Sequence, residues 1–288
     1  MARKNNVKHV LFVYDHKYPK LWRDGLWAAL ELLNENKDFK VSKYNLNENN
    51  YELTFDSALY DFILGWGAYG SPVDQALALV KESDQFVKKL PMGLCLAGNG
   101  TPIPTTNIYD VTFYETEWAK KNYLAPVKGN LVHAFGVNTD MYTKWEEAPI
   151  IWDWLSVGAF AYWKRHERMI AKSGTKLVVG EIQRDNWGES FDIISDLLLA
   201  GVGVSDMLYP GKLRNIYNCS DVVYIPADLN GGGERAVLEA RACGRPVEVE
   251  RDNPKLQELV DGPLQNHHYY AEQLKKGING VISSEKAH

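Results

Sequence analysis

The sequence predicts an α/β fold with two domains, each a parallel sheet covered by helices. Short apolar runs of strand length alternate with longer segments of helical period, which is typical of parallel sheets with helical crossovers. The 288 residues correspond to about two domains, at roughly 150 residues each. A polar stretch with a proline, TDMYTKWEEAPI at 139–150, separates two series of strands and is expected to be the linker.

Apolar and β-branched runs predict the strands, and apolar residues at helical spacing predict the helices between them. In the first half, strands are expected at 8–14, 39–45, 61–64, 92–97, 109–114 and 130–133, and helices at 22–35 and 73–89. In the second half, strands are expected at 150–157, 176–180, 200–204, 222–225 and 246–249, and helices near 163–172, 190–198, 211–218 and 234–243. These elements predict domains over 1–145 and 146–288, with a frayed tail at 283–288. The domains are expected to face a cleft, with ligands at the carboxyl ends of the strands.

Composition and charge exclude several classes of protein. Apolar residues make up 45% and charged residues 24%, the balance of a globular chain. The net charge of −5 provides no overall positive field for nucleic acid or anionic lipid. Apolar runs such as 196–204 are far shorter than the ~20 residues that span a bilayer, and no signal peptide is apparent, so no stable membrane insertion and a cytoplasmic location are expected. Cys95, Cys219 and Cys243 lie far apart among apolar neighbours, which favours reduced core residues.

Two glycine-rich segments follow predicted strands. GWGAYG at 65–70 has the letter pattern of a dinucleotide-binding loop, but it follows the third strand, and two further residues precede the next helix. A tight turn lining the cleft is therefore favoured there over a dinucleotide site. Gly231, Gly232 and Gly233 directly precede the helix predicted at 234–243. Uncovered backbone amides at a helix start form a site for phosphate oxygens, with a flexible loop as the alternative.

The run NIYNCSDVVYIPADLNGGGERAVLEARACGRPV at 215–247 resembles the donor-binding segment of retaining glycosyltransferases of family 4, which have the GT-B fold of two Rossmann-like domains. That family carries an E-x7-E motif ending in LEAMACGxPV, and LEARACGRPV at 238–247 is similar to it. LVHAFGVNTDMY at 131–142 and VGAFAYWKR at 157–165 are similar, in order, to two further family segments. In the first half, the resemblance extends only to the pattern of strands and helices.

The resemblance implies transfer of a sugar from a nucleoside-diphosphate sugar to a hydroxyl acceptor, with retained configuration. Glu239 matches the glutamate that accepts hydrogen bonds from the ribose hydroxyls, a task that suits an acceptor-only carboxylate. Lys164, six residues after Gly158, matches the lysine that neutralises the diphosphate, where a fixed cation stabilises the departing charge. No D-x-D motif is present, so this lysine and the glycine amides are expected to replace a metal. The expected co-substrate is the nucleotide sugar, with no other cofactor.

Two positions depart from the family pattern. The arginine expected after Gly158 is Ala159, and the first glutamate of E-x7-E, which normally approaches the sugar, is Gly231. Glu234 and Arg184 are candidates to compensate for these losses. Because half of the usual polar groups are missing, a protein that binds a nucleotide sugar without turnover is the alternative function.

Other donor contacts are less specific. Gln183 and Tyr209 are candidates for the nucleotide base, and Asn99 is a candidate contact of the sugar in a region where the family often has a histidine. Arg165, His166 and Arg168 are expected on a solvated helix face.

The acceptor is expected at the end of the first strand and the start of the first helix, where the family has a glycine-rich acceptor loop. The candidates there are Asp15, His16, Lys17, Arg23 and Asp24. A soluble glycan or small molecule is favoured as the acceptor. A modified base of viral or phage DNA is the alternative, because basic and aromatic residues alternate over 17–23. A nicotinamide-dependent oxidoreductase, based on GWGAYG alone, is the remaining alternative.

Overall fold

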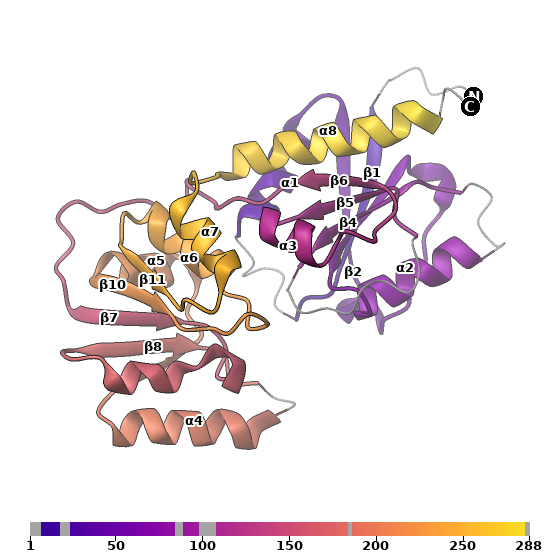
Figure 1. Ribbon diagram of the computed structural model, residues 1–288. Coiled ribbons are helices and arrows are strands. Elements are labelled where there is room, and N and C mark those ends of the chain that lie inside the picture. The colour runs from indigo at the N-terminus through magenta and orange to yellow at the C-terminus, as the bar shows by residue number, and fades with distance from the viewer. Residues whose placement is uncertain (1–6, 18–23, 84–88, 98–107, 184–185, 286–288) are drawn as a thin grey trace. The chain divides into compact units, whose positions relative to one another are not determined.

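The computed structural model describes residues 7–17, 24–83, 89–97, 108–183 and 186–285. The chain divides into two compact units, of which the first comprises Met1–Phe135 with His267–His288 and the second comprises Gly136–Asn266. Each unit is built on one parallel sheet with helices packed against it (Figure 1). The predicted α/β class is therefore confirmed.

The sheet of the first unit has six parallel strands in the order β2-β1-β3-β4-β5-β6. The strands are β1 (Lys8–Tyr14), β2 (Phe39–Asn45), β3 (Phe62–Gly67), β4 (Met92–Leu96), β5 (Val111–Tyr114) and β6 (Asn130–His133). Every strand predicted in this half is present. β3 continues three residues beyond its predicted end, because Gly65 and Gly67 pair with Leu94 and Leu96 of β4.

Helices cover both faces of this sheet. They are α1 (Gly25–Glu35), α2 (Pro72–Glu82), α3 (Glu117–Asn122) and α8 (His267–Glu285), with short 3-10 helices η2 (Asn47–Asn49) and η3 (Ser57–Leu59). Leu11 and Val13 of β1 share a core cluster with Val73 of α2. The opposite face receives α1, whose Trp27 ring packs edge-on against Tyr14. The alternation of side chains along a strand explains both contacts.

Helix α8 was not predicted, and the expected frayed tail from residue 283 is wrong as far as Glu285, because the helix continues to that residue. It packs on α1, β5 and β6, and Figure 1 shows it in yellow beside α1. Gly277 permits this packing, since a Cβ there would lie 2.5 Å from the ring of Phe113. The last helix of the chain therefore belongs to the first unit.

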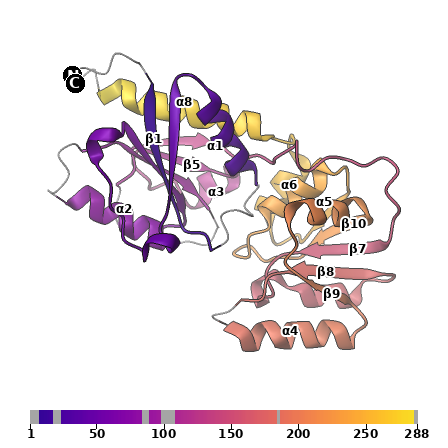
Figure 2. The same cartoon turned by 180° about the vertical axis from the view of Figure 1, so that it is seen from behind.

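The sheet of the second unit has five parallel strands in the order β11-β10-β7-β8-β9 (Figure 2). The strands are β7 (Trp152–Val157), β8 (Lys176–Gly180), β9 (Gly203–Asp206), β10 (Ser220–Ile225) and β11 (Val247–Val249). The helices are α4 (Trp187–Leu199), α5 (Pro210–Asn218), α6 (Glu234–Ala242) and α7 (Pro254–Asp261). All five strands agree with the prediction, although β9 begins three residues later than expected.

The helix predicted over 163–172 is wrong. The segment forms two short 3-10 helices, η4 (Tyr162–Lys164) and η5 (His166–Ala171), separated by Arg165 in the left-handed region at φ 52°. His166 is 1% exposed, and its ring contacts the Ser156 hydroxyl and the carbonyl oxygens of Gly158 and Ala159. These contacts hold the segment against β7 in place of a regular helix.

The division between the units differs from the predicted boundary at residue 145. The stretch 139–150 has no helix or strand, as expected of a linker, but it lies in the second unit. Asn218 holds it there, because its side-chain oxygen accepts from the Trp145 amide at 2.7 Å and its side-chain amide donates to the Thr143 carbonyl at 2.9 Å.

The described parts of the chain contain no helix that is long and apolar enough to cross a membrane. Cys95, Cys219 and Cys243 are buried and unbridged, as predicted. Burial raises the pKa of Cys243 to about 12, which keeps its thiol protonated at neutral pH.

Asp24 provides a test of how α1 begins. It is 8% exposed, and its carboxylate accepts a 2.9 Å hydrogen bond from the Trp27 amide as the helix N-cap. Replacement by Ala is expected to lower the unfolding free energy of the first unit by about 1 kcal/mol, because one amide of the first turn loses its partner. Denaturant unfolding followed by circular dichroism measures this. Asp24→Asn, which retains a capping oxygen, is the control, and equal stability of Asp24→Ala and the wild type would contradict the role.

Candidate functional site

The order of strands in the second sheet indicates where its ligand site lies. The chain proceeds from β7 to β8 and β9 on one side, and then returns to place β10 and β11 on the other side of β7. In parallel α/β sheets, ligands bind beyond the carboxyl ends of the strands at such a point of reversal. The segments that leave β7 and β10 there are 158–165 and 226–233, which contain Lys164, Gly231, Gly232 and Gly233 of the predicted donor site.

A backbone contact joins these two segments. The amide of Asp228 donates to the Trp163 carbonyl at 2.9 Å. A Cβ on Gly231 would lie 2.4 Å from that same oxygen, a distance that backbone atoms cannot tolerate. Glycine is therefore required at 231, and the glutamate of the family motif cannot occupy this backbone position.

The three glycines have different tasks. Gly231 donates its amide to the Asp228 carbonyl at 2.9 Å, so the expectation that this amide faces a phosphate is wrong for this turn. Gly232 and Gly233 have φ of 65° and 125°, which glycine adopts without strain. Helix α6 begins directly after them, and Gly233 at its N-cap provides no side-chain hydrogen bond. The first turn of α6 thus keeps the polarity that favours an anion.

Lys164 lies beside this turn, as the sequence analysis expected. Its ammonium nitrogen is 3.3 Å from the position that a Cβ on Gly232 would occupy, and its side chain packs next to Gly158. Burial lowers the pKa of Lys164 to about 8, while the Glu234 carboxylate acts in the opposite direction. The structure therefore brings a cation and the start of α6 together at the point of strand reversal.

Glu234 is the first residue of α6, and it is held in place. It is 5% exposed, and one carboxylate oxygen is 2.7 Å from the ammonium of the buried Lys255. Burial acts to raise the pKa of Glu234, but Lys255 beside it lowers the pKa below its ordinary value. The glutamate is thus ionised and paired with Lys255.

Glu239 lies five residues further along α6 and is 8% exposed, so it is not a solvent-facing helix residue. It accepts a 3.1 Å hydrogen bond from the hydroxyl of the fully buried Tyr217. This contact fixes one carboxylate oxygen.

The candidates for the base lie on the loops after β8 and β9. Gln183 is partly buried, and its backbone amide donates to the hydroxyl of Ser190 in α4 at 3.2 Å. Tyr209 is 56% exposed at the start of α5. Arg184 lies outside the described residues, so nothing is added here to that prediction.

The residues after Lys164 differ in part from the expected solvated face. Arg165 and Arg168 form ion pairs with Asp252 at 2.7 Å and Glu250 at 2.6 Å, on the segment after β11. The prediction for His166 is wrong, because its ring is buried. Burial, with a smaller effect of the nearby Lys164, lowers the pKa of His166 to about 4, so the ring is neutral. Since carbonyl oxygens only accept, Nε2 carries the proton and Nδ1 accepts from Ser156.

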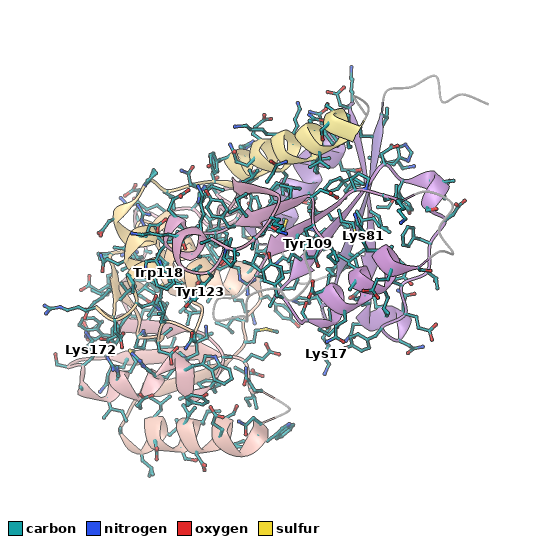
Figure 3. All side chains as sticks on the ribbon, turned by 45° about the vertical axis from the view of Figure 1, so that its right-hand side comes forward. Lys17, Lys81, Tyr109, Trp118, Tyr123 and Lys172 are labelled. Carbon is teal, nitrogen blue, oxygen red and sulfur yellow. The ribbon has the colours of Figure 1, made fainter. Side chains whose placement is uncertain are left out.

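The candidates in the first unit lie after β1. The amide of His16 donates to the Asn45 side chain at 3.1 Å, and the Asn45 amide returns a bond of 2.8 Å to the His16 carbonyl. Asp15 is partly buried, and Lys17 is exposed and points away from the unit (Figure 3). Asp24 acts as the cap of α1. Arg23 and Asn99 lie outside the described residues.

GWGAYG does not form the predicted turn as a whole. Gly65 and Gly67 belong to β3, and a Cβ on Gly65 would lie 2.7 Å from the Leu77 side chain of α2. A Cβ on Gly67 would lie 2.6 Å from the hydroxyl of Ser71, which caps α2. Both glycines therefore allow α2 to approach the sheet, and only the end of the motif, at Gly70 with φ 78°, forms a turn.

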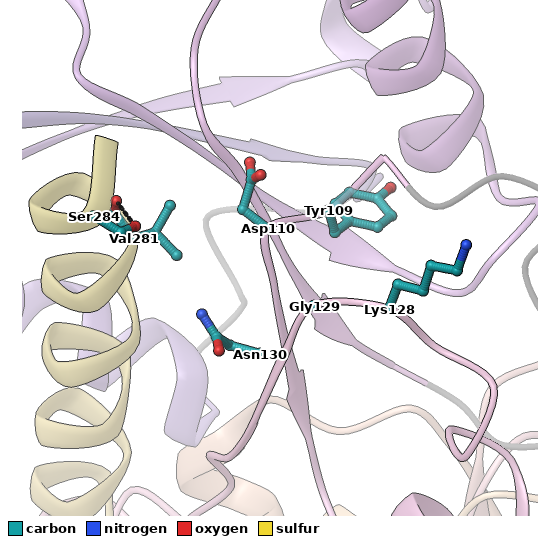
Figure 4. A pocket seen from close by; sticks show the side chains of 7 residues that line it. All are labelled: Tyr109, Asp110, Lys128, Gly129, Asn130, Val281 and Ser284. Carbon is teal, nitrogen blue, oxygen red and sulfur yellow. Dashed lines mark hydrogen bonds between the residues drawn. The ribbon is translucent and has the colours of Figure 1, made fainter. Parts of the chain in front are cut away.

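A pocket of about 340 Å³ lies in the first unit, at the amino ends of β5 and β6 (Figure 4). It is lined by Tyr109, Asp110, Lys128, Gly129, Asn130, Val281 and Ser284. Asp110 accepts from the Met92 amide at 2.8 Å and lies 3.8 Å from Lys81, so its carboxylate is used in the fold. This end of the sheet is opposite to the end where ligands of such domains bind.

Comparison with known proteins decides the fold. No family model and no curated protein sequence matches the chain. Among solved structures, the chain is similar to AviGT4, a glycosyltransferase involved in avilamycin A biosynthesis, with a TM-score of 0.64 and 11% identity over 96% of this chain and 98% of that one. The fold is GT-B. Anabaena HepE in complex with UDP-glucose matches with a TM-score of 0.62 and 14% identity, over 96% and 90% of the two chains.

The same fold occurs with other chemistry. A putative UDP-N-acetylglucosamine 2-epimerase from Listeria monocytogenes matches with a TM-score of 0.59 and 13% identity, over 96% of this chain and 97% of that one. At such identities the likeness concerns the GT-B architecture, and the reaction must be argued from the residues of this chain.

Gly231 permits a direct test of the turn. Gly231→Glu, which restores the family glutamate, is expected to destabilise the second unit by about 1 to 3 kcal/mol, because its Cβ would collide with the Trp163 carbonyl. Thermal unfolding measures the loss. Asn230→Glu adds the same side chain at the exposed neighbouring position and serves as the control. Unchanged stability of Gly231→Glu would contradict the contact.

Proposed function

We propose that the protein is a glycosyltransferase that moves a sugar from a nucleoside-diphosphate sugar to a hydroxyl acceptor. The proposal rests on the position of the Lys164 ammonium, which lies next to Gly232 just before α6, at the point where the strand order reverses. A helix start and a lysine are suited to two phosphates, whose negative charge grows as the bond to the sugar breaks. The structures of HepE in complex with UDP and with UDP-glucose support a donor of this class.

In the proposed reaction, the bond between the anomeric carbon and the phosphate oxygen breaks, and a bond from the acceptor oxygen to that carbon forms. The acceptor proton passes to the departing phosphate, so no protein base is required. Lys164 and the amides at the start of α6 stabilise the diphosphate as it leaves. We expect Glu239 to bind the ribose hydroxyls, because a carboxylate only accepts hydrogen bonds and the Tyr217 hydroxyl holds it in place.

The resemblance to family 4 supports retention of configuration and activity without a metal or another cofactor. We expect the first unit to bind the acceptor near Asp15 and His16, and the second unit to bind the donor. A soluble hydroxyl compound remains the preferred acceptor and a modified DNA base the alternative, and the cytoplasm is the expected location.

One observation favours a second function. The contact of Gly231 with Trp163 excludes a glutamate from the motif position, and Ala159 replaces the arginine. A protein with this site would still hold the phosphates and the ribose, and so would bind a nucleotide sugar without turnover. Release of free sugar from the donor, measured with and without candidate acceptors, distinguishes this protein from the transferase.

A thermal-shift screen tests the donor class. Nucleoside diphosphates and their sugars are expected to stabilise the protein, since a ligand at 100 times its Kd adds about 2.7 kcal/mol to the unfolding free energy. The same screen includes NAD and NADP, the ligands of the oxidoreductase alternative. Stabilisation by the dinucleotides alone, or by none of these compounds, would refute the proposal.

Lys164→Ala is expected to reduce turnover about 10²-fold, because the departing diphosphate loses its fixed cation. Hydrolysis or transfer of the donor sugar measures the effect, and circular dichroism verifies the fold. Lys172→Ala is the matched control on the same segment, since Lys172 pairs with Glu248 at the edge of the sheet. Full activity of Lys164→Ala would show that the diphosphate binds elsewhere.

A further inference from the structure

A buried ion pair lies directly behind the proposed phosphate site. Lys255, the second residue of α7, is 0% exposed, and its ammonium is 2.7 Å from one carboxylate oxygen of Glu234. Removing two charges from water carries a large desolvation cost, so a buried ion pair is weak support for stability alone. The pair therefore calls for a role other than holding α6 against α7.

The second oxygen of Glu234 faces the side on which Lys164 lies. This oxygen is 3.5 Å, and the Lys164 ammonium 3.3 Å, from the single point that a Cβ on Gly232 would occupy. One carboxylate thus lies between two lysines, in close contact with Lys255 and in electrostatic reach of Lys164. The three side chains together have a net charge of +1.

Four charged groups act on the Lys164 ammonium. Glu234 and Asp228 favour its protonated form, whereas Lys255 and Arg235 disfavour it, and the ring of His166 nearby is neutral. After burial, Glu234 has the largest effect. Without Glu234, the amine would lose its proton more readily and present no charge to a phosphate. Without Lys255, the carboxylate would be available to pair with Lys164 and compete with that phosphate.

We propose that Glu234 and Lys255 are positioning residues for Lys164: Glu234 keeps its ammonium charged, and Lys255 holds the carboxylate so that the charge stays available to the donor. This role rests on the proposed function, because the anion concerned is the donor diphosphate. It also assigns Glu234 to the phosphate side of the reaction, and not to the sugar.

The pH dependence of binding follows from the proposal. A protonated Lys164 binds the phosphates, so affinity is full well below pH 8 and falls as the pH rises through about 8. In Glu234→Gln with Lys255→Met, a neutral pair of similar size, the pKa of Lys164 falls, because Glu234 raises this pKa more than Lys255 lowers it, and the loss of affinity begins at a lower pH. In Lys255→Met alone, this pKa rises, yet affinity at pH 7 falls about tenfold because Glu234 competes for the ammonium.

Two measurements test this. NMR titration of the free protein with lysine labelled at the ε-carbon gives the pKa of Lys164, whose signal is assigned by its absence in Lys164→Met. Calorimetry from pH 6 to 9 gives the Kd of UDP-glucose, whose two phosphates have constant charge over this range. The proposal is supported if the pKa of Lys164 is highest in Lys255→Met, intermediate in the wild type and lowest in the double variant. Lys255→Met must also bind UDP-glucose more weakly than the wild type.

Failure of this inference and failure of the proposed function give different results. Equal Lys164 pKa values in all variants, with changes in thermal stability alone, would show that the ion pair is only structural and would overturn the inference. The expected pKa order without binding of any nucleotide sugar by the wild type would refute the proposed function, and with it the role of the pair in donor binding. Because the double variant removes both charges of the Glu234–Lys255 pair, it leaves neither partner of that pair buried without the other, and it keeps the test valid if Lys255→Met fails to fold.

Discussion

The candidate site depends on one backbone contact, between the Trp163 carbonyl and the loop after β10. This oxygen accepts from the Asp228 amide and lies where a side chain at position 231 would begin. The contact joins the segments that leave two adjacent strands, β7 and β10, at the point where the strand order reverses. It thereby fixes Lys164, the residue after Trp163, beside the glycines that precede α6. Neither segment has a regular helix that would hold it there independently.

Buried polar groups support this contact from both sides. Asn253 at the start of α7 is fully buried, and its side-chain amide donates to the carbonyls of Ala227 and Asp228 at 3.0 and 2.9 Å. His166 binds the carbonyls of Gly158 and Ala159 on the other segment. Such hydrogen bonds satisfy carbonyls that irregular buried backbone would otherwise leave without partners, at a cost of about 1 to 3 kcal/mol each. The loops are therefore positioned by packed elements, as a preorganised site requires.

The strands and the glycine turn were predictable from sequence because their causes are local. An apolar run such as VVYI at 222–225 indicates a buried strand, and three glycines before a helix indicate an open helix start. Other features have causes that are distant in the chain. Helix α8 packs with the first unit because Gly277 fits against Phe113, and Glu234 is fixed by Lys255, which is 21 positions later in the sequence. Local patterns contain no signal for such partners, and His166 was misplaced for the same reason.

Glycine at position 231, where the resembling family has a glutamate, has a physical explanation in this chain. A glutamate at position 231 would bring negative charge and a Cβ into the contact with Trp163, and only glycine fits there. A carboxylate is present three residues later, at Glu234, where the ammonium of Lys255 forms an ion pair with it. The missing arginine at 159 would have added a cation on the β7 side, and Lys255 supplies a second cation from the opposite side of the turn. A site with two lysines and one carboxylate has the net positive charge that favours a diphosphate, so glycine at position 231 and alanine at position 159 are compatible with the proposed donor.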